Sequence, residues 1–184
     1  MTRIVAGTVG GRRLKVPPGG TRPTSDRVRE AVFSRLDHLG IIEGAVVIDL
    51  YAGSGAFGLE SASRGAETVH LVEADRAAAA TCRANVSALG LSGVQVHRTT
   101  VEQFCATTPL AADVIFADPP YDIDDGALHV VLSAAAAHLA EDGVLVLETT
   151  RRRGEPNWPE LLELDAARTY GETSVWYLGR GDSR

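Results

Sequence analysis

Four consecutive residues, Asp118-Pro119-Pro120-Tyr121 (the DPPY motif), have the chemistry needed to act on an amino group of a nucleobase. Such an amine is a poor nucleophile because its lone pair is delocalised into the ring. The Asp118 carboxylate and the carbonyl of Pro119, whose φ angle is fixed, can accept the two amine hydrogens and localise that pair. The Tyr121 ring offers a surface on which an extruded base can stack. The alternative is a strand that ends in a Pro-Pro turn, because motifs this short also occur by chance.

A second candidate site lies in the segment from Asp49 to Gly58, which also follows an apolar run. Its glycines have the GxGxxG spacing of dinucleotide-binding folds and let the backbone approach a ligand closely. Asp49 suits a pyrophosphate poorly and a cationic amino-acid group well, because an ammonium needs an acceptor. Glu73, at the end of the next apolar run, can accept both hydroxyls of a ribose. An amino acid and a ribose without phosphate are features of S-adenosylmethionine, which we therefore expect as the cofactor.

The elements that would position these motifs alternate along the chain between strand and helix. Apolar runs predict strands at 45–50, 68–73, 94–98, 113–118 and 143–148, and helical spacing predicts helices from Thr24 or Ser25 to Gly40 and at 57–64, 76–89, 101–106 and 126–139. Asp75 is expected to cap the third helix. This alternation predicts a parallel sheet covered on both faces, and the runs 161–168 and 174–178 predict an antiparallel hairpin that closes it. Ligands bind such sheets beyond the carboxyl ends of the strands, where both motifs lie.

Length and composition indicate one globular domain with a small appendage. The chain has 184 residues, of which 45% are hydrophobic and 23% charged, and no apolar run reaches membrane-spanning length. Residues 1–7 lack the apolar segment of a secretory signal. Cys82 and Cys105 have no metal-ligand or CxxC spacing, so we expect no metal site and no disulfide. We therefore expect a cytoplasmic protein.

Charge is distributed unevenly between the N-terminal segment and the rest of the chain. The net charge is −6, yet residues 1–35 hold eight basic and two acidic side chains, or +6, which leaves −12 for the remainder. The pieces around Gly10-Gly11 predict a small hairpin, followed by a linker at 17–20. We expect residues 1–22 to form this basic extension and residues 23–184 the main domain. A polyanionic partner would be contacted by Arg12, Arg13, Lys15, Arg22 and Arg27; the alternative is a solvated charged surface.

The segment 49–55, Glu73, the DPPY motif and the leader Arg22 to Glu30 together resemble the RsmD family of bacterial 16S ribosomal RNA guanine-N2 methyltransferases. The resemblance covers nearly the whole chain, and the leader is its most specific part. It implies a class I, Rossmann-like methyltransferase fold with a seven-stranded sheet whose last strand is antiparallel. It also implies S-adenosylmethionine as the methyl donor and methylation of the exocyclic N2 amine of one particular guanine. The expected substrate is the 16S rRNA, in the 30S subunit or an assembly intermediate.

The resemblance assigns roles to individual residues of this chain. The target base is expected at the catalytic residues Asp118, Pro119, Pro120 and Tyr121. The cofactor is expected at Asp49, Tyr51, Gly53, Ser54, Gly55 and Glu73. Many such enzymes place an acid after the third strand to hold the adenine amine, whereas this chain has Thr99-Thr100-Val101 there. The Thr100 hydroxyl or the Val101 backbone is expected to replace it.

Several other residues are open to more than one interpretation. Arg151-Arg152-Arg153 could contact phosphate or form a solvated run, and Trp158 and Trp176 are expected to pack near the closing hairpin. His70 is expected to be structural, and His38, His97, His129 and His138 are expected to cluster with nothing. A DNA amino-methyltransferase acting on adenine N6 or cytosine N4 shares the DPPY chemistry, but no target-recognition domain is evident. A small-molecule or protein methyltransferase would leave the basic extension unexplained, and a non-catalytic RNA-binding assembly factor is the remaining alternative. We expect a monomer with no obligate protein partner.

Overall fold

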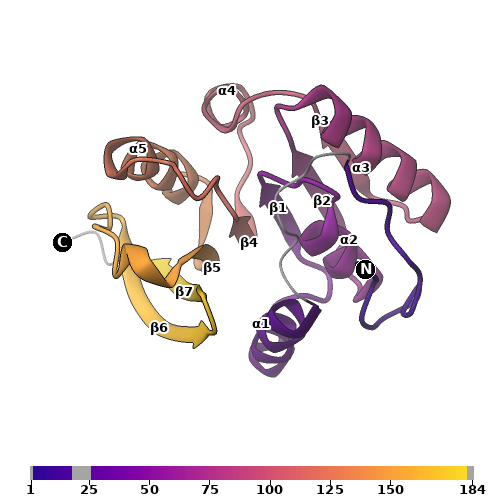
Figure 1. The fold of residues 1–184 in the computed structure, drawn as a ribbon, viewed down its shortest axis with the longest axis horizontal. Helices are drawn as coiled ribbons and strands as arrows, with labels where there is room; N and C mark the ends of the chain where they lie inside the picture. The colour runs from indigo at the N-terminus through magenta and orange to yellow at the C-terminus, as the bar shows by residue number, and fades with distance from the viewer. Residues whose placement is uncertain (1, 18–25, 182–184) are drawn as a thin grey trace.

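The computed structural model describes residues 2–17 and 26–181, and these form a seven-stranded sheet in the order β3-β2-β1-β4-β5-β7-β6 (Figure 1). The first five strands are parallel, and β7 runs antiparallel to both of its neighbours. The strands are β1 (Val46–Leu50), β2 (Thr68–Val72), β3 (Val94–His97), β4 (Ala112–Ala117), β5 (Leu139–Thr150), β6 (Leu162–Tyr170) and β7 (Thr173–Arg180). The predicted fold class, with its antiparallel last strand, is confirmed.

Within the described ranges, five α-helices cover the two faces of this sheet. They are α1 (Asp26–Leu39), α2 (Ala56–Ser63), α3 (Arg76–Leu89), α4 (Val101–Thr107) and α5 (Asp125–Ala136), with a 3-10 turn at Arg151–Arg153. One apolar core joins α1, α2 and α3 to one face, and a second joins α4 and α5 to the other. Figure 1 shows α1 and α5 on opposite sides of the sheet. Inner strands such as β1 and β4 therefore carry apolar side chains on both faces, which explains their nearly continuous apolar sequences.

The largest difference from the expected elements is the start of β5. The sequence predicts a helix over 126–139, whereas α5 ends at Ala136 and β5 already includes Leu139, which pairs with Ala112. Just beyond the helix, the ring nitrogens Nδ1 and Nε2 of the buried His138 each lie 2.9 Å from a main-chain carbonyl, of Leu110 and of Cys105 respectively, which holds this residue outside the helix. Tertiary contacts thus override the helical propensity of the alanine-rich segment.

The predicted N-terminal hairpin is present, but it is short and joined to the main core. A single bridge pairs Arg3 with Arg13, while Ile4 and Leu14 are buried among residues of α1 and α2. The main-chain N–H groups of Val5 and Ala6 donate to the buried Glu60 carboxylate at 2.6 and 3.0 Å. The linker beyond Pro17, Arg22 and the expected caps Thr24 and Ser25 lie outside the described residues. The hairpin therefore shares its apolar core with the main domain.

The structure also tests three smaller expectations, about a helix cap, the two tryptophans and the histidines. Asp75 caps α3 by accepting from the N–H of Ala78 at 2.8 Å, as predicted. Trp158 and Trp176 pack with ring centroids 5.6 Å apart, also as predicted. The expectation that no other histidine clusters with His70 is wrong: His70 Nδ1 lies 3.0 Å from Nε2 of His97. The two rings meet because His97 pairs with Val72, two positions along β2 from His70, so both side chains lie on the same face of neighbouring strands. None of the helices in the described ranges has the length and apolarity to cross a bilayer.

Candidate active site

Three carboxylates lie at the carboxyl ends of neighbouring strands, at the point where the strand order reverses. Asp49 is in β1, Glu73 follows β2 and Asp118 follows β4, and β1 lies between the other two strands. Their proximity is evident in the electrostatics of Asp49. Its pKa is raised to about 7, chiefly by burial and also by the charges of Asp118 and Glu73, against the lowering effect of a hydrogen bond from the N–H of Gly58. The sheet thus brings together three acids that are distant in the sequence.

The turn after β1 (residues 51–55, the glycine loop) has a backbone that most side chains could not adopt. Gly53 and Gly55 have positive φ angles of 57° and 81°, and Tyr51 has φ 62°. Such angles are uncommon for residues other than glycine, which makes Tyr51 a strained position. Gly58, in α2, lies so close to β2 that a Cβ atom would come 2.2 Å from a methyl group of Leu71. These features let the loop curve tightly over the strand ends and present its backbone to a ligand.

Side chains from α3 hold the glycine loop in place. The Asn85 amide donates to the carbonyl of Ser54 at 2.9 Å and to that of Lys15 at 3.0 Å, and it accepts from the N–H of Lys15. Cys82 donates to the carbonyl of Gly53 at 3.1 Å. Sequence reasoning missed both α3 residues, although polar side chains three positions apart in an alanine-rich helix were a usable signal. Both hold the glycine loop, and Asn85 also ties it to the N-terminal hairpin.

Glu73 is positioned by two main-chain donors. Its carboxylate accepts from the N–H of Gly53 at 2.9 Å and from that of Asp75 at 2.8 Å. Each carboxylate oxygen has a second lone pair, so both can still accept from a ligand. The side chain is half-buried beside the glycine loop. The position predicted to hold a ribose therefore faces the loop predicted to hold an amino acid.

The predicted adenine contacts lie at the start of α4. The Thr100 hydroxyl caps this helix by accepting from the N–H of Gln103 at 3.2 Å, and the Val101 side chain is buried. Burial, with the nearby charges of Glu102 and Cys105, raises the pKa of Tyr51 to about 12, which places the Tyr51 hydroxyl close to α4. The helix cap uses one lone pair of the Thr100 hydroxyl oxygen. An adenine amine would therefore donate either to the second lone pair of this oxygen or to a main-chain carbonyl.

The DPPY motif forms a turn from β4 toward α5. Asp118 is half-buried and Pro119 is buried, whereas the Tyr121 side chain is 47% exposed. The N–H of Ile123 donates to the carbonyl of Pro120 at 3.0 Å, which closes the turn. The role predicted for these residues, to hold a flipped base, stays a prediction.

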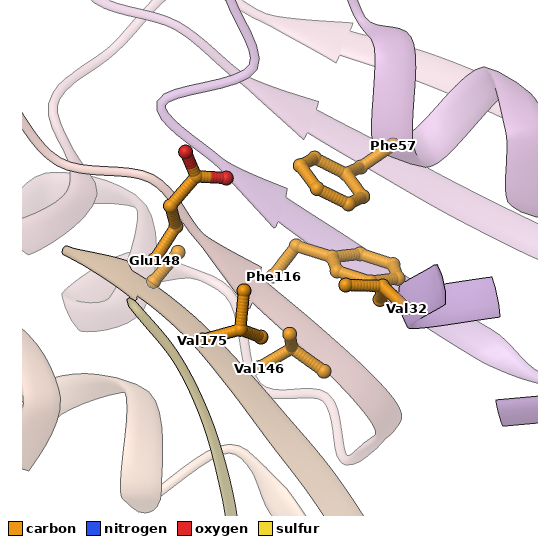
Figure 2. A pocket seen from close by; sticks show the side chains of 7 residues that line it. Val32, Phe57, Phe116, Val146, Glu148 and Val175 are labelled. Carbon is orange, nitrogen blue, oxygen red and sulfur yellow. The ribbon is translucent and has the colours of Figure 1, made fainter. Parts of the chain in front are cut away.

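A small pocket lies at the carboxyl ends of β4 and β5. It is lined by Val32, Phe57, Phe116, Ala117, Val146, Glu148 and Val175, and its empty volume is about 200 Å³. Figure 2 shows the Glu148 carboxylate across this space from the rings of Phe57 and Phe116. These rings stack with centroids 4.8 Å apart. Sequence reasoning did not single out Glu148, because one acid after an apolar strand is common.

The predicted RNA contacts have different surroundings. Arg12, Arg13 and Lys15 are exposed on the hairpin, where Arg12 also donates to the carbonyl of Ala88 at 2.6 Å, and Arg27 is exposed on the first turn of α1. Arg22 lies outside the described residues. Arg29, which contributes to the basic count of the N-terminal segment, is fully buried and bonds Asp26 at 2.8 Å. The basic surface is therefore smaller than the sequence count implies.

Comparisons with known proteins agree on the nature of this chain. The family model described as conserved hypothetical protein 95 matches residues 2–179. Ribosomal RNA small subunit methyltransferase D of Escherichia coli K12 is 33% identical over 94% of this chain and 86% of its own length. The protein of the same name from Haemophilus influenzae is 30% identical over 88% of this chain and 86% of its own length. The solved yhhF protein of Escherichia coli superposes with a TM-score of 0.86 and 32% identity over 97% of each chain.

Proposed function

Since the chain belongs to the family described as conserved hypothetical protein 95, the RsmD family that its motifs resemble, we propose that it methylates N2 of a guanine in 16S rRNA, with S-adenosylmethionine as the donor. The relatives from Escherichia coli and Haemophilus influenzae bear the name ribosomal RNA small subunit methyltransferase D. The observation that carries the proposal is the convergence of Asp49, Glu73 and Asp118 at the switch in strand order.

The residues at the strand ends fit this donor. Asp49 and Glu73 supply acceptors for an ammonium and for ribose hydroxyls, and the glycine loop between them leaves room for a ligand against its backbone. Both of these side chains are acids, which would repel a phosphate and therefore suit a donor without one. When bound, the donor supplies a methyl group on a positively charged sulfur.

The DPPY motif would hold the guanine amine in line with that methyl group. Asp118 and the Pro119 carbonyl accept its two hydrogens, and the exposed ring of Tyr121 stacks on the base. Flipping the base out costs a few kcal/mol, and less if it already lies in a loop. Alignment of two reactants near contact can supply about 7 to 11 kcal/mol. No strong base is required, since the amine becomes acidic as it is methylated.

The proposal is tested by offering several substrates to the purified protein. Labelled donor is incubated separately with 30S subunits, naked 16S RNA and duplex DNA, and the nucleosides are identified by mass spectrometry. N2-methylguanosine from the ribosomal substrates is the expected product. Methylated adenine or cytosine from DNA, or no methylated nucleoside with any substrate, would refute the proposal.

A further inference from the structure

Asn85 of α3 joins two segments of the chain that have different expected partners. Its amide nitrogen donates to the carbonyl of Ser54, in the glycine loop, at 2.9 Å and to the carbonyl of Lys15, in the N-terminal hairpin, at 3.0 Å. Its amide oxygen accepts from the N–H of Lys15 at 2.9 Å. The glycine loop is expected to bind the donor, and the hairpin is expected to bind RNA. One buried side chain, only 2% exposed, therefore contacts the segment that serves each ligand.

The hydrogen bonds of Asn85 depend on one another. The two bonds with Lys15 fix the plane of the amide, because its oxygen makes one and its nitrogen makes the other. This orientation aims the remaining N–H of the amide at the carbonyl of Ser54. If Lys15 moved away, the amide would be free to rotate and its bond to Ser54 would weaken. A buried amide that loses its partners is costly, so the three residues are expected to hold together or to loosen together.

The main chain and the side chain of Lys15 serve different purposes. Its main chain is bonded to Asn85, whereas the residue as a whole is exposed, as are Arg12 and Arg13 of the same hairpin. Arg12 also donates to the carbonyl of Ala88 in α3, and Figure 1 shows the N-terminal segment beside this helix. An RNA phosphate that binds these cationic side chains would restrain the same main chain that orients Asn85.

We propose that Asn85 is a positioning residue that couples RNA binding by the hairpin to donor binding by the glycine loop. This inference rests on the proposed function and deepens it. RNA and donor each restrict the motion of the unit formed by Lys15, Asn85 and Ser54, so the conformational entropy lost when the first binds is not lost again when the second binds. Each ligand therefore raises the affinity for the other by the same factor. The donor binds most tightly once the RNA is in place.

The test measures the affinity of the protein for 30S subunits with and without saturating S-adenosylhomocysteine, the donor after loss of its methyl group. This compound keeps the amino acid and the ribose but permits no turnover. The ratio of the two affinities is the coupling factor, which we expect to be about fivefold or more in the wild-type protein. In Asn85→Ala it should fall below about twofold. Ser87→Ala, at an exposed position of the same helix, is the control and should keep the wild-type factor.

A matched pair of variants at Lys15 tests the same link while Asn85 stays in place. Lys15→Ala and Lys15→Pro both remove the side-chain charge, so both should bind 30S subunits more weakly than the wild-type protein. Proline also removes the main-chain N–H from which Asn85 accepts. The coupling factor should therefore persist in Lys15→Ala and be lost in Lys15→Pro. This pair decides the matter if thermal unfolding shows that Asn85→Ala does not fold.

A purely structural role of Asn85 would lower stability and both affinities but leave their ratio unchanged. An unchanged coupling factor in Asn85→Ala, or equal factors in the two Lys15 variants, would therefore overturn the proposed coupling. A wild-type factor below about twofold, or no binding to 30S subunits, would overturn it as well. Absence of N2-methylguanosine with the wild-type protein would instead refute the proposed function, because the coupling factor is measured by binding without methyl transfer.

Discussion

The guanidinium of Arg153 donates a hydrogen bond to the main-chain carbonyl of Ile123, two residues beyond Tyr121. The same side chain pairs with Asp125 at the start of α5 and is only 15% exposed. Arg153 lies in the turn after β5, so it joins the carboxyl end of that strand to the segment that follows the DPPY motif. The arginine run at 151–153 is therefore neither wholly solvated nor wholly available for phosphate: Arg151 and Arg152 are exposed, whereas Arg153 turns inward.

Arg153→Gln should lower the turnover number while leaving donor affinity within about threefold. Loss of the bond to Ile123 loosens the turn that positions Asp118 and Tyr121, and a misplacement of about 1 Å can cost about 100-fold in rate. Turnover on 30S subunits and donor binding by calorimetry are the measurements. Arg152→Gln is the control, since its side chain is 89% exposed and lies 3.9 Å from Glu172. Equal turnover numbers for the two variants would show that Arg153 does not position the motif.

Asp118→Ala should abolish methylation of the ribosomal substrate and leave donor binding within a few fold. The reason is that Asp118 is expected to contact the amine, whereas the donor contacts are expected at Asp49, Glu73 and the glycine loop. Tritium transfer to RNA and donor calorimetry measure the two effects separately. Asp122→Ala, one residue beyond the motif and exposed, serves as the control. A normal methylation rate in Asp118→Ala would remove Asp118 from the mechanism.

Donor affinity should rise with pH through about 7. Burial raises the pKa of Asp49 to about 7, so below this pH the carboxyl is neutral and cannot pair with the donor ammonium. Each pH unit below 7 is expected to weaken binding about tenfold. The effect on folding has the opposite sign: the stability from neutral Asp49 is fully present below about pH 4 and is lost as pH rises through about 7.

Calorimetry between pH 5.5 and 7.5 measures this dependence. Asp49→Asn should bind the donor weakly at every pH in the range. Asp118→Asn should move the midpoint to lower pH, because the charge of Asp118 is one cause of the raised pKa of Asp49. A wild-type affinity that stays constant over this range would mean that Asp49 does not hold the ammonium.

Much of the fold could be predicted because its signals are local. Strands buried on both faces appear as continuous apolar runs, and glycines such as Gly65 and Gly90 mark the ends of the helices before them. The start of β5 could not be predicted, because it depends on contacts of His138 with the carbonyls of Leu110 and Cys105, which lie about thirty positions away in the sequence. An alanine-rich segment has no local feature that stops a helix at Ala136.

The candidate site also has residues that could be predicted from the sequence and residues that could not. Asp49 and Asp118 were identifiable because each begins a recognisable motif, the glycine-rich segment and the DPPY motif, and Glu73 because its strand follows that of Asp49; parallel strands end at one edge of the sheet. Asn85 and Arg153 act through partners 70 and 30 residues distant, Lys15 and Ile123, and such pairings are invisible in a local pattern. The sequence shows which residues have suitable chemistry, whereas the supporting side chains become evident only when the strands are assembled.

Neutralising the exposed charges of the hairpin should weaken RNA binding and reduce its dependence on salt. Removal of one phosphate-binding cation lowers the slope of log affinity against log salt by about 0.7 to 0.9. The affinity of the double variant Arg13→Ala/Lys15→Ala for 16S RNA, measured between 50 and 200 mM salt, tests this prediction.

Deleting residues 1–20 is a poorer test, because it also removes the buried Ile4 and Leu14 from the core. Arg168→Ala, an exposed position on β6 at the opposite sheet edge, is the control, and an equal slope in both proteins would exclude a role for the hairpin.

Replacing Glu60 by alanine should destabilise the whole domain and release the N-terminal hairpin. Glu60 is fully buried, accepts from Val5, Ala6 and Nε of Arg64, and lies 3.9 Å from the buried guanidinium of Arg29. Removing one partner of a buried ion pair costs about 3 to 5 kcal/mol, because the remaining charge is left uncompensated. Urea unfolding measures this loss, and amide exchange at Val5 and Ala6 reports on the hairpin.

Glu43→Ala, at an exposed position, should change the free energy of unfolding by less than about 0.5 kcal/mol. Protection of Val5 and Ala6 that survives in Glu60→Ala would mean that the apolar contacts of Ile4 and Leu14 suffice to dock the hairpin.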